Sequence, residues 1–469
     1  MVETEIKSKR EIVAIVAPNS MAYRMVTESN ILPLLYQSGV NKIFLLGPRK
    51  GICVGLPEYV EYRVVFEPEQ VPALSLINRF GRSVVFRMRK LFGVNFGNLA
   101  YRFNEIHGFA AHKIKKKLSP QQREREELAG NFVDSKFCRV LPTSKWLYSL
   151  LYSICYSLIF PVNRSISHFF LINKIDIAVF WHVQAAIYQE YSVCVRQNNI
   201  KTVGVLGSWD RPTTKGPICP NISRYIVNSL LMKKELIAYH DVGSKHVSVV
   251  GWPHLDVYRQ SDTFMSKKVF RKKAGLPVEG RVILFAANSP RLGPHEPAIA
   301  LALAKSIKAG DFGDDCCLVV RPHPADMEWE ERFREVCISN NVILMRAELG
   351  NIKWLANVLL YSDVIIATQG SVTLDAVALD KPVINIAFDD FESSSCKSVM
   401  WMYDMDHYRS VMDSGGVSIA YDMEMLQKYI RNYLQNPSDD SKGRKLLREW
   451  QFGPFDGQSS KWMSEAILQ

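Results

Sequence analysis

The sequence has none of the short motifs that mark several common enzyme classes. Its 469 residues contain no Walker loop, no Gly-x-Ser-x-Gly nucleophile motif and no Gly-x-Gly-x-x-Gly motif, and the last absence disfavours an NAD enzyme. Cys-x-x-Cys and His-x-x-x-His pairs, which are common among zinc ligands, do not occur either. We therefore expect no dinucleotide cofactor and no zinc site.

Signals for export or membrane insertion are also lacking. The nine cysteines are odd in number and several lie in apolar runs, which is typical of reduced thiols in a cytosolic protein. The first ten residues are polar and mixed in charge, unlike a signal peptide. The aromatic-rich apolar run at 146–160 has 15 residues, whereas about 20 are needed to span a bilayer. These features predict a cytoplasmic protein without a transmembrane helix.

The charge balance favours an anionic partner. Lys and Arg number 58 and Asp and Glu 47, a formal net charge of +11. Residues 79–127 alone hold twelve Lys or Arg against four Glu. With the apolar run that follows, they form an insertion at about 79–160. Two interpretations stay open: the apolar run packs inside the domain, or the insertion binds an anionic membrane surface with its apolar side in the headgroup layer.

Outside this insertion, short β-branched runs alternate with helical segments. This pattern predicts an α/β protein with two Rossmann-like, doubly wound parallel sheets. We expect an N-terminal domain over 1–265, a C-terminal domain over 266–440 and a helical segment over 441–469 that packs back on the N-terminal domain. The basic segment 261–280 is the expected boundary. The expected strands are 12–18, 42–48, 175–181, 202–206, 224–228 and 246–250, then 281–287, 318–320, 342–345, 364–367, 383–386 and 417–419, and a helix is expected over 329–338.

A strand, a small polar loop and a helix follow one another over 362–384. Gly370 allows a ligand to approach the backbone closely, and the first amides of the helix, with the Ser371 and Thr373 hydroxyls, form a seat for a phosphate. Asp375 lies on the same helix face as Ser371, where its carboxylate is placed to accept hydrogen bonds from ribose hydroxyls. The alternative is an ordinary capped helix after a strand.

Two more loops are expected at the same sheet edge. Arg321 and His323 follow a strand in Val319-Val-Arg-Pro-His-Pro324. Arginine offers a fixed positive fork to a diphosphate, and histidine donates a hydrogen bond or a proton to a leaving phosphate. Arg291, in the loop after the strand at 281–287, is a further candidate. A purely structural role for the Arg-Pro-His-Pro loop remains the alternative.

The N-terminal half offers candidates for acid–base chemistry. Gly207-Ser-Trp-Asp-Arg-Pro-Thr-Thr-Lys-Gly216 follows a strand, and Asp210 in it is a candidate base that removes a proton from an acceptor hydroxyl. Lys215 would neutralise charge on the phosphates or on an acidic acceptor. His182, at the end of another strand, is the rival base. The alternative for Asp210 is a buried carboxylate that caps its own loop.

These segments resemble a known superfamily. Residues 362–384 resemble the nucleotide-binding signature of GT-B glycosyltransferases. Residues 319–324 are similar to an element of bacterial CDP-glycerol glycerophosphotransferases and surface-polysaccharide transferases. About 270 residues from Ile175 onward share the pattern. Further matching elements lie at 225–229 and 249–258, in Phe455-Asp-Gly-Gln-Ser459, and in the loop at 207–216, where Arg211 replaces the usual Asn.

The resemblance implies a transferase with its donor site in the C-terminal domain and its acceptor site in the N-terminal domain. It would move a sugar, or a polyol phosphate, from a nucleotide-activated donor to a surface-glycan or lipid-linked acceptor. It would work on the inner face of the plasma membrane in polysaccharide or capsule biosynthesis. No metal is expected, since helix dipoles and basic side chains carry the diphosphate charge in GT-B enzymes. Asp404-Met-Asp406 has the spacing of a GT-A metal motif but follows Trp401-Met-Tyr403, not a nucleotide-binding α/β start.

Two other functions stay open at this point. A non-hydrolysing UDP-N-acetylglucosamine 2-epimerase shares the GT-B architecture, but it would need several carboxylates from the N-terminal half, and only Asp210 is well placed. A basic nucleic-acid-binding protein is the more distant alternative. It would leave the phosphate-seat loops unexplained, and no nucleic-acid-binding module is recognisable.

Overall fold

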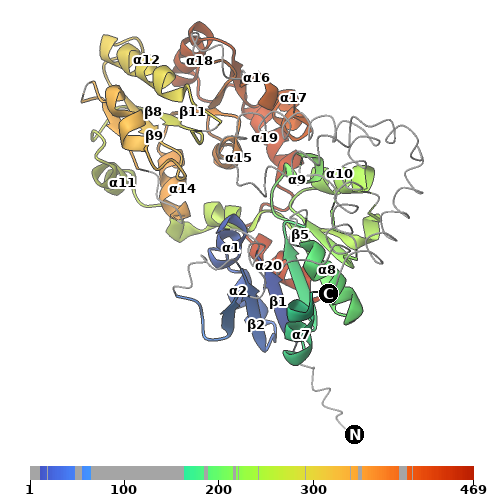
Figure 1. Cartoon of the computed structure of the whole chain (residues 1–469). Helices are drawn as coiled ribbons and strands as arrows, with labels where there is room; N and C mark the ends of the chain where they lie inside the picture. Colours follow the sequence, from blue (N-terminus) through green and yellow to red (C-terminus); the bar gives the residue numbers. More distant parts are fainter. Residues whose placement is uncertain are drawn as a thin grey trace, which may run out of the picture. The chain divides into compact units, whose positions relative to one another are not determined.

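The computed structural model divides into two compact units, Met1–Pro253 with Ser459–Gln469, and His254–Gln458 (Figure 1). The segment 261–280, where the sequence predicts a boundary, lies within the second unit. The insertion at 79–160, Lys215 and Arg291 lie outside the described residues. The structure describes residues 11–17, 20–47, 55–64, 163–183, 188–214, 218–219, 221–240, 242–290, 292–338, 340–346, 351–389, 399–403 and 405–469.

A parallel sheet forms the centre of the first unit. Its seven described strands lie in the order β3-β2-β1-β4-β5-β6-β7. The chain moves outward from β1 in one direction, returns to pair β4 with β1, and then moves outward in the other direction, which is the doubly wound arrangement. The strands are β1 (Ile12–Val16), β2 (Lys42–Leu46), β3 (Val60–Arg63), β4 (Ile177–Trp181), β5 (Lys201–Leu206), β6 (Arg224–Val227) and β7 (Val247–Val249).

Helices cover both faces of this sheet. Alternate residues of β1, such as Val13 and Ile15, share a buried cluster with residues of α1, α2 and α20. The C-terminal helix α20 packs on α2, and the Ser464 hydroxyl donates to the Ile31 carbonyl over 3.4 Å. On the other face, the ring of Phe44 in β2 meets that of Phe169 in α7. The helices are α1 (Ser20–Thr27), α2 (Ile31–Gln37), α7 (Arg164–Ile172), α8 (Tyr188–Gln197), α9 (Arg211–Thr214), α10 (Leu230–His240) and α20 (Ser459–Leu468).

The second unit repeats the arrangement with six described strands. Their order is β10-β9-β8-β11-β12-β13, all parallel. The strands are β8 (Arg281–Ala286), β9 (Cys316–Arg321), β10 (Val342–Leu344), β11 (Val364–Thr368), β12 (Val383–Ile386) and β13 (Ser418–Ala420). The main helices are α11 (Lys267–Ala274), α12 (Glu296–Ala309), α14 (Ile352–Leu360), α15 (Ser371–Ala378), α17 (Arg409–Ser414), α18 (Met423–Gln435) and α19 (Ser441–Gln451).

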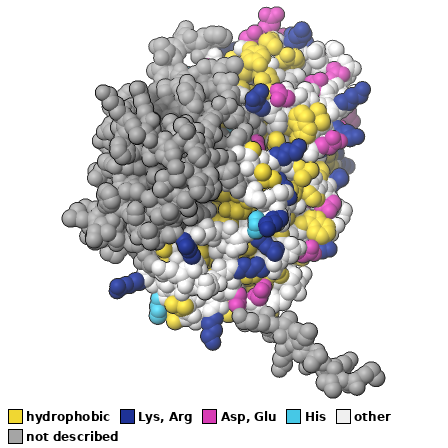
Figure 2. All heavy atoms as spheres, turned by 90° about the vertical axis from the view of Figure 1, so that its right-hand side faces the viewer, with side chains coloured by type: hydrophobic (Ala, Val, Ile, Leu, Met, Phe, Trp, Pro, Cys, Tyr) yellow, Lys and Arg dark blue, Asp and Glu magenta, His cyan; other side chains and the backbone are white. Residues whose placement is uncertain are grey.

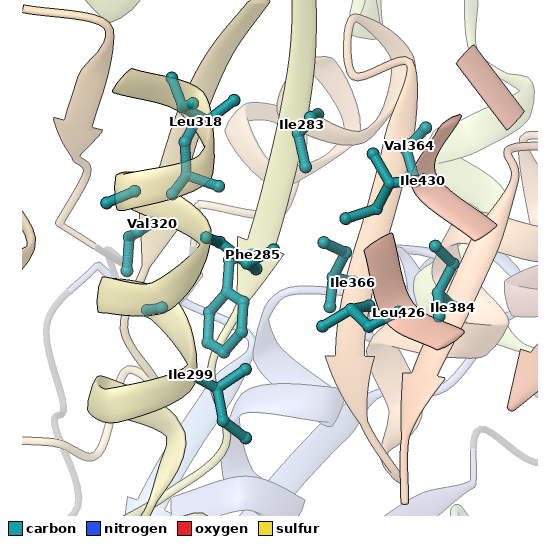
Figure 3. Packing of buried hydrophobic residues seen from close by; sticks show 14 of the residues in the cluster. Ile283, Phe285, Ile299, Leu318, Val320, Val364, Ile366, Ile384, Leu426 and Ile430 are labelled. Atoms are coloured by element: carbon teal, nitrogen blue, oxygen red, sulfur yellow. The ribbon is translucent and has the colours of Figure 1, made fainter. Parts of the chain in front are cut away.

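The core of this unit follows from the period of two along each strand. Ile283 and Phe285 alternate along β8 and belong to one buried cluster, in which Phe285 lies beside Ile299 of α12 (Figure 3). Leu426 and Ile430, one turn apart on α18, pack over the same face beside β11 and β12. The alternate residues of β8, Val282 and Leu284, are buried on the opposite face, so β8 is apolar on both faces and packing from both sides fixes its position. The positions of the strand ends, which carry the candidate site, are fixed with it.

The last helix of the second unit is anchored by a buried arginine. Arg444 of α19 is fully buried, and its Nε donates to the Asp380 Oδ1 over 3.0 Å. Gly443 makes close packing of α19 feasible, because a Cβ there would lie 2.3–2.4 Å from the backbone at Gly415 and Gly416. The expected helical segment 441–469 is thus α19 in the second unit and α20 in the first.

The prediction of two doubly wound parallel sheets is confirmed. The helix expected over 329–338 is wrong in extent: the chain forms α13 (Trp329–Arg332) and a 3-10 turn at Arg334–Val336. Phe333, between them, is fully buried in the core, so packing of this side chain outweighs continuation of the helix.

The described surface is mixed in charge. Lys and Arg side chains lie among Asp and Glu on the face shown in Figure 2. None of the helices in the described part of the chain is long and apolar enough to cross a bilayer. The basic stretch that carries most of the net charge in the sequence falls outside this part.

Candidate active site

The candidate donor site lies at the carboxyl ends of β8, β9 and β11. The sheet order of the second unit reverses between β8 and β11, which pair directly. Open α/β sheets bind ligands outside the carboxyl ends of their strands at such a reversal. Arg321 is the last residue of β9, and Gly370 follows β11 by two residues. The structure therefore brings the predicted loops to one sheet edge.

The start of α15 offers free backbone amides at this edge. Gly370 precedes the helix in an extended conformation (φ 178°), and Ser371, the first helical residue, is exposed. Within the described residues, no side chain caps this end. The amides of the first turn, together with the helix dipole, suit an anionic group.

Thr373, by contrast, faces the interior. Its hydroxyl is fully buried and accepts a hydrogen bond from the Asn385 Nδ2 over 3.0 Å. The Tyr408 hydroxyl donates to the same oxygen over 3.4 Å and also to the Asn385 Oδ1. Asn385 in turn donates to the Ala367 carbonyl at 3.1 Å. Thr373 thus helps to fix α15 against β11 and β12, and the sequence gives no sign of these distant partners.

Asp375 sits in a buried polar cluster. The Tyr258 hydroxyl donates to its Oδ1 over 3.1 Å, and the His254 Nε2 lies 3.9 Å from the same atom. Burial raises the pKa of Asp375 to about 7, while the Tyr258 hydrogen bond and the charge of Arg321 act to lower it. Burial also lowers the pKa of His254 to about 4, so this imidazole is neutral at pH 7. The neutral groups Tyr258 and His254 hold the carboxyl in place, and burial outweighs the opposing charge of Arg321.

Arg321 supplies positive charge next to this carboxyl. It is 9% exposed, and burial lowers its pKa while Asp375 and Tyr258 act to raise it. Its Nε is buried and has no hydrogen-bond partner among the described residues. A buried guanidinium with an unmade hydrogen bond is ready to bind an anionic ligand.

His323 has a defined tautomer. Its Nδ1 accepts a hydrogen bond from the Ala325 amide over 3.0 Å, so the proton of the neutral ring lies on Nε2. Burial, with the nearby charge of Arg321, lowers the pKa of His323. The ring is therefore neutral at pH 7 and presents an Nε2–H donor, which favours hydrogen bonding to a phosphate over full proton transfer.

In the first unit, the two rival bases lie at neighbouring strand ends. His182 directly follows β4, is fully buried and has a φ of 66°, which is uncommon for a residue other than glycine. Gly207 follows β5, and a Cβ on it would lie 3.1 Å from the His182 Cε1 and 2.9 Å from the Trp181 Nε1. Asp210 lies three residues further on, so both candidates belong to one edge of the sheet.

Asp210 is half-buried, and its Oδ1 accepts a hydrogen bond from the Ser208 Oγ over 2.5 Å. Its backbone carbonyl accepts from the Thr213 amide in α9 over 3.3 Å. The residue therefore orders its own loop, as the structural alternative for Asp210 predicts. Lys215 and Arg291 lie outside the described residues.

Among the described residues, no group of three His, Cys, Asp or Glu side chains is placed to hold a metal ion. Asp404 and the side chain of Asp406, which have the spacing of a metal motif, lie outside this description.

Comparison with known families decides the class of protein. Residues 218–469 match the family described as CDP-Glycerol:Poly(glycerophosphate) glycerophosphotransferase. This match covers 252 of 469 residues, more than half of the chain. The chain belongs to this family. The matched region contains every donor-side candidate but neither His182 nor Asp210. A comparison with curated proteins gives no match.

Solved structures share the fold at low identity. A putative UDP-N-acetylglucosamine 2-epimerase from Listeria monocytogenes has a TM-score of 0.54 at 11% identity, covering 98% of this chain and 96% of that chain. The S. aureus MnaA–UDP structure has a TM-score of 0.52 at 11% identity, covering 96% and 94%. A glycosyltransferase from Rickettsia africae has a TM-score of 0.50 at 12% identity, covering 98% and 99%. These likenesses show the fold alone.

The fold is that of GT-B enzymes, and the family is one of transferases that use a nucleotide-activated donor. Both points confirm predictions from the sequence. The sequence leaves open whether the transferred group is a sugar or a polyol phosphate, and the family's name specifies glycerol phosphate.

Among the residues at the candidate site, sequence reasoning missed Tyr258 and His254. Both lie in the segment 249–258, one of the elements that match the superfamily, but their partner Asp375 is more than a hundred residues away.

Proposed function

We propose that this protein transfers glycerol phosphate, or a closely related polyol phosphate, from a CDP-activated donor to a surface-glycan or lipid-linked acceptor, with no bound metal. The observation that carries the proposal is the cluster of Asp375, Tyr258 and Arg321 at the strand ends of a domain that matches the glycerophosphotransferase family. It joins a ribose-binding carboxyl to a buried positive charge, as a nucleoside diphosphate requires.

On the donor side, the amides after Gly370 and the Ser371 hydroxyl bind a phosphate oxygen. Arg321 supplies positive charge to the diphosphate, and His323 donates from Nε2 to the phosphate of the leaving CMP. Asp375 accepts hydrogen bonds from the ribose hydroxyls. Thr373 holds α15 in place from inside the domain, and Arg291 is a further candidate on the loop after β8.

The reaction is a phosphoryl transfer. An acceptor hydroxyl oxygen attacks the phosphorus atom that carries the glycerol, and a new P–O bond forms while the P–O bond to CMP breaks. Asp210 is the proposed base that takes the hydroxyl proton and passes it to water, with His182 as the rival. Lys215 neutralises charge on the phosphates or the acceptor. The departing CMP takes the bonding electron pair, and the hydrogen bond from His323 stabilises its negative charge.

The proposed place of action is the inner face of the plasma membrane, where a lipid-linked acceptor would be available. The support comes from the sequence: the basic stretch at 79–127 is followed by an apolar run too short to span a bilayer. The protein would bind there peripherally.

Calorimetric titration with CDP-glycerol, CMP and UDP-N-acetylglucosamine tests the donor assignment. We expect CDP-glycerol and CMP to bind, and substitution of Arg321 by Gln to weaken both. Tight binding of UDP-N-acetylglucosamine alone, followed by its conversion to the 2-epimer, would instead support the epimerase alternative.

A further inference from the structure

A buried carboxylate holds the two loops on either side of the sheet reversal. Glu296 is the first residue of α12 and is 3% exposed. Its Oε2 accepts a hydrogen bond from the Asn288 amide over 2.7 Å, in the loop after β8. Its Oε1 accepts one from the Thr368 hydroxyl at the end of β11. One side chain therefore contacts both loops that flank the expected phosphate position.

The same two loops are joined a second time. The Asn288 Nδ2 donates to the Gln369 carbonyl over 3.1 Å, one residue before Gly370. The Gln369 Nε2 lies 2.9 Å from the His407 Nε2, and its backbone amide donates to the Tyr403 hydroxyl at 3.2 Å. The residue that precedes the phosphate seat is thus fixed by its backbone and its side chain.

Arg332 links the loop after β9 to the loop after β8. It forms an ion pair with Asp326, which lies three residues after His323 and is 3% exposed. Its Nη2 donates to the Gly293 carbonyl over 3.0 Å. Gly293 lies directly against the Glu296 carboxylate, since a Cβ on it would be 2.3 Å from the Glu296 Cδ. The loops after β8, β9 and β11 therefore form one connected network.

We propose that Glu296 and Arg332 are positioning residues of the donor site, which hold the three phosphate-binding loops in one arrangement before the donor binds. This inference rests on the proposed function. A carboxylate that served only α12 would accept from the first-turn amides of that helix, whereas the Glu296 carboxylate accepts from Asn288 and Thr368, which lie outside α12. Preorganised loops matter because a misplacement of about 1 Å costs on the order of 100-fold in rate.

Thr368→Val tests the network with little change in side-chain volume. It removes the hydroxyl that donates to Glu296 and leaves the residues that we expect to contact the donor unchanged. The matched control is Ser362→Ala, at the opposite end of β11, where a 1% exposed hydroxyl donates to the Val358 carbonyl over 2.7 Å. Both variants lose one buried hydrogen bond, so both should lower the melting temperature.

Only Thr368→Val should raise the Kd for CDP-glycerol, by about tenfold as measured by calorimetry on the full chain, because loops that are no longer preorganised must be ordered when the donor binds. Glu296→Ala should raise it further, and Glu296→Gln, whose amide still offers one acceptor and one donor, should retain most of the affinity. A Kd for Thr368→Val no higher than that for Ser362→Ala would overturn the proposal.

Arg321→Gln, measured alongside, separates two kinds of failure. If Arg321→Gln weakens binding while Thr368→Val does not, the donor site stands and the positioning role is refuted. If wild-type protein binds neither CDP-glycerol nor CMP, the proposed function is refuted and the positioning role is refuted with it.

Discussion

Substitution of Asp375 by Asn should stabilise the protein at alkaline pH while it destroys donor binding. Burial raises the pKa of this carboxyl from 3.8 to about 7. The folded state therefore favours the protonated form, and ionisation at higher pH destabilises the fold. Ionisation of Asp375 therefore lowers the free energy of unfolding increasingly as pH rises from 3.8 to about 7. Above pH 7 this loss of stability is constant.

The magnitude follows from the size of the shift. A change of about three pKa units corresponds to about 4 kcal/mol at 1.36 kcal/mol per unit. The Asn side chain removes the ionisation but keeps an oxygen that accepts from Tyr258. The free energy of unfolding of Asp375→Asn should therefore exceed that of wild type by up to about 4 kcal/mol at pH 8, and by only about 1 kcal/mol at pH 4.5.

Urea unfolding at both pH values, followed by circular dichroism, measures this difference. Asp315→Asn is the control with the opposite sign, because hydrogen bonds from Arg281 lower the pKa of Asp315. The exposed ion pair between Arg281 and Asp315 stabilises the protein slightly above pH 3.8, where Asp315 is ionised. Asp315→Asn should therefore slightly lower the free energy of unfolding at pH 8. Calorimetry with CDP-glycerol should show that Asp375→Asn has lost most of its affinity.

Two results would contradict this reasoning. If Asp375→Asn were no more stable than wild type at pH 8, the carboxyl would not be strained by burial. If it bound CDP-glycerol as wild type does, the carboxyl would not contact the ribose. A gain in stability with a loss of binding is the pattern expected of a side chain retained for function.

Three further predictions concern other parts of the chain. Ser371→Ala should weaken binding of CDP-glycerol by about 1–3 kcal/mol, as for a hydrogen bond to a charged group, and unchanged affinity in calorimetry would remove Ser371 from the site. Asp210→Asn should bind donor normally but transfer glycerol phosphate about 10²–10⁴-fold more slowly; a wild-type rate would move the role of base to His182. Liposome co-sedimentation should require anionic lipid and fall with added salt, and equal recovery with neutral vesicles would argue against surface attraction by the insertion. Replacement of Arg87, Arg89 and Lys90 by Glu should weaken this co-sedimentation.

The sheets could be predicted from the sequence because their signal is local. Buried parallel strands read as short β-branched runs, as in Val364–Thr368, and the small polar loop after that run indicates a strand end. Since the carboxyl ends of neighbouring parallel strands meet at one edge, the sequence alone places Arg321 and Gly370 together.

Side-chain pairing could not be predicted in the same way. Thr373 was expected at the phosphate seat, yet its rotation on α15 directs the hydroxyl to Asn385 and Tyr408. A shift of two positions along a helix turns a side chain by about 200°, so Ser371 and Thr373 cannot serve the same ligand equally. The link between Glu296 and Thr368 joins residues 72 apart and leaves no local pattern.

The most direct test of the central claim is acceptor-dependent turnover of CDP-glycerol. Purified protein is incubated with CDP-glycerol and a lipid-linked polyol-phosphate acceptor without added divalent metal and with chelator present, and the products are followed by ³¹P NMR. We predict that CMP and a new phosphodiester appear together in equal amounts, and that both require the acceptor. Intact CDP-glycerol under these conditions, with turnover of a UDP-sugar instead, would contradict the claim.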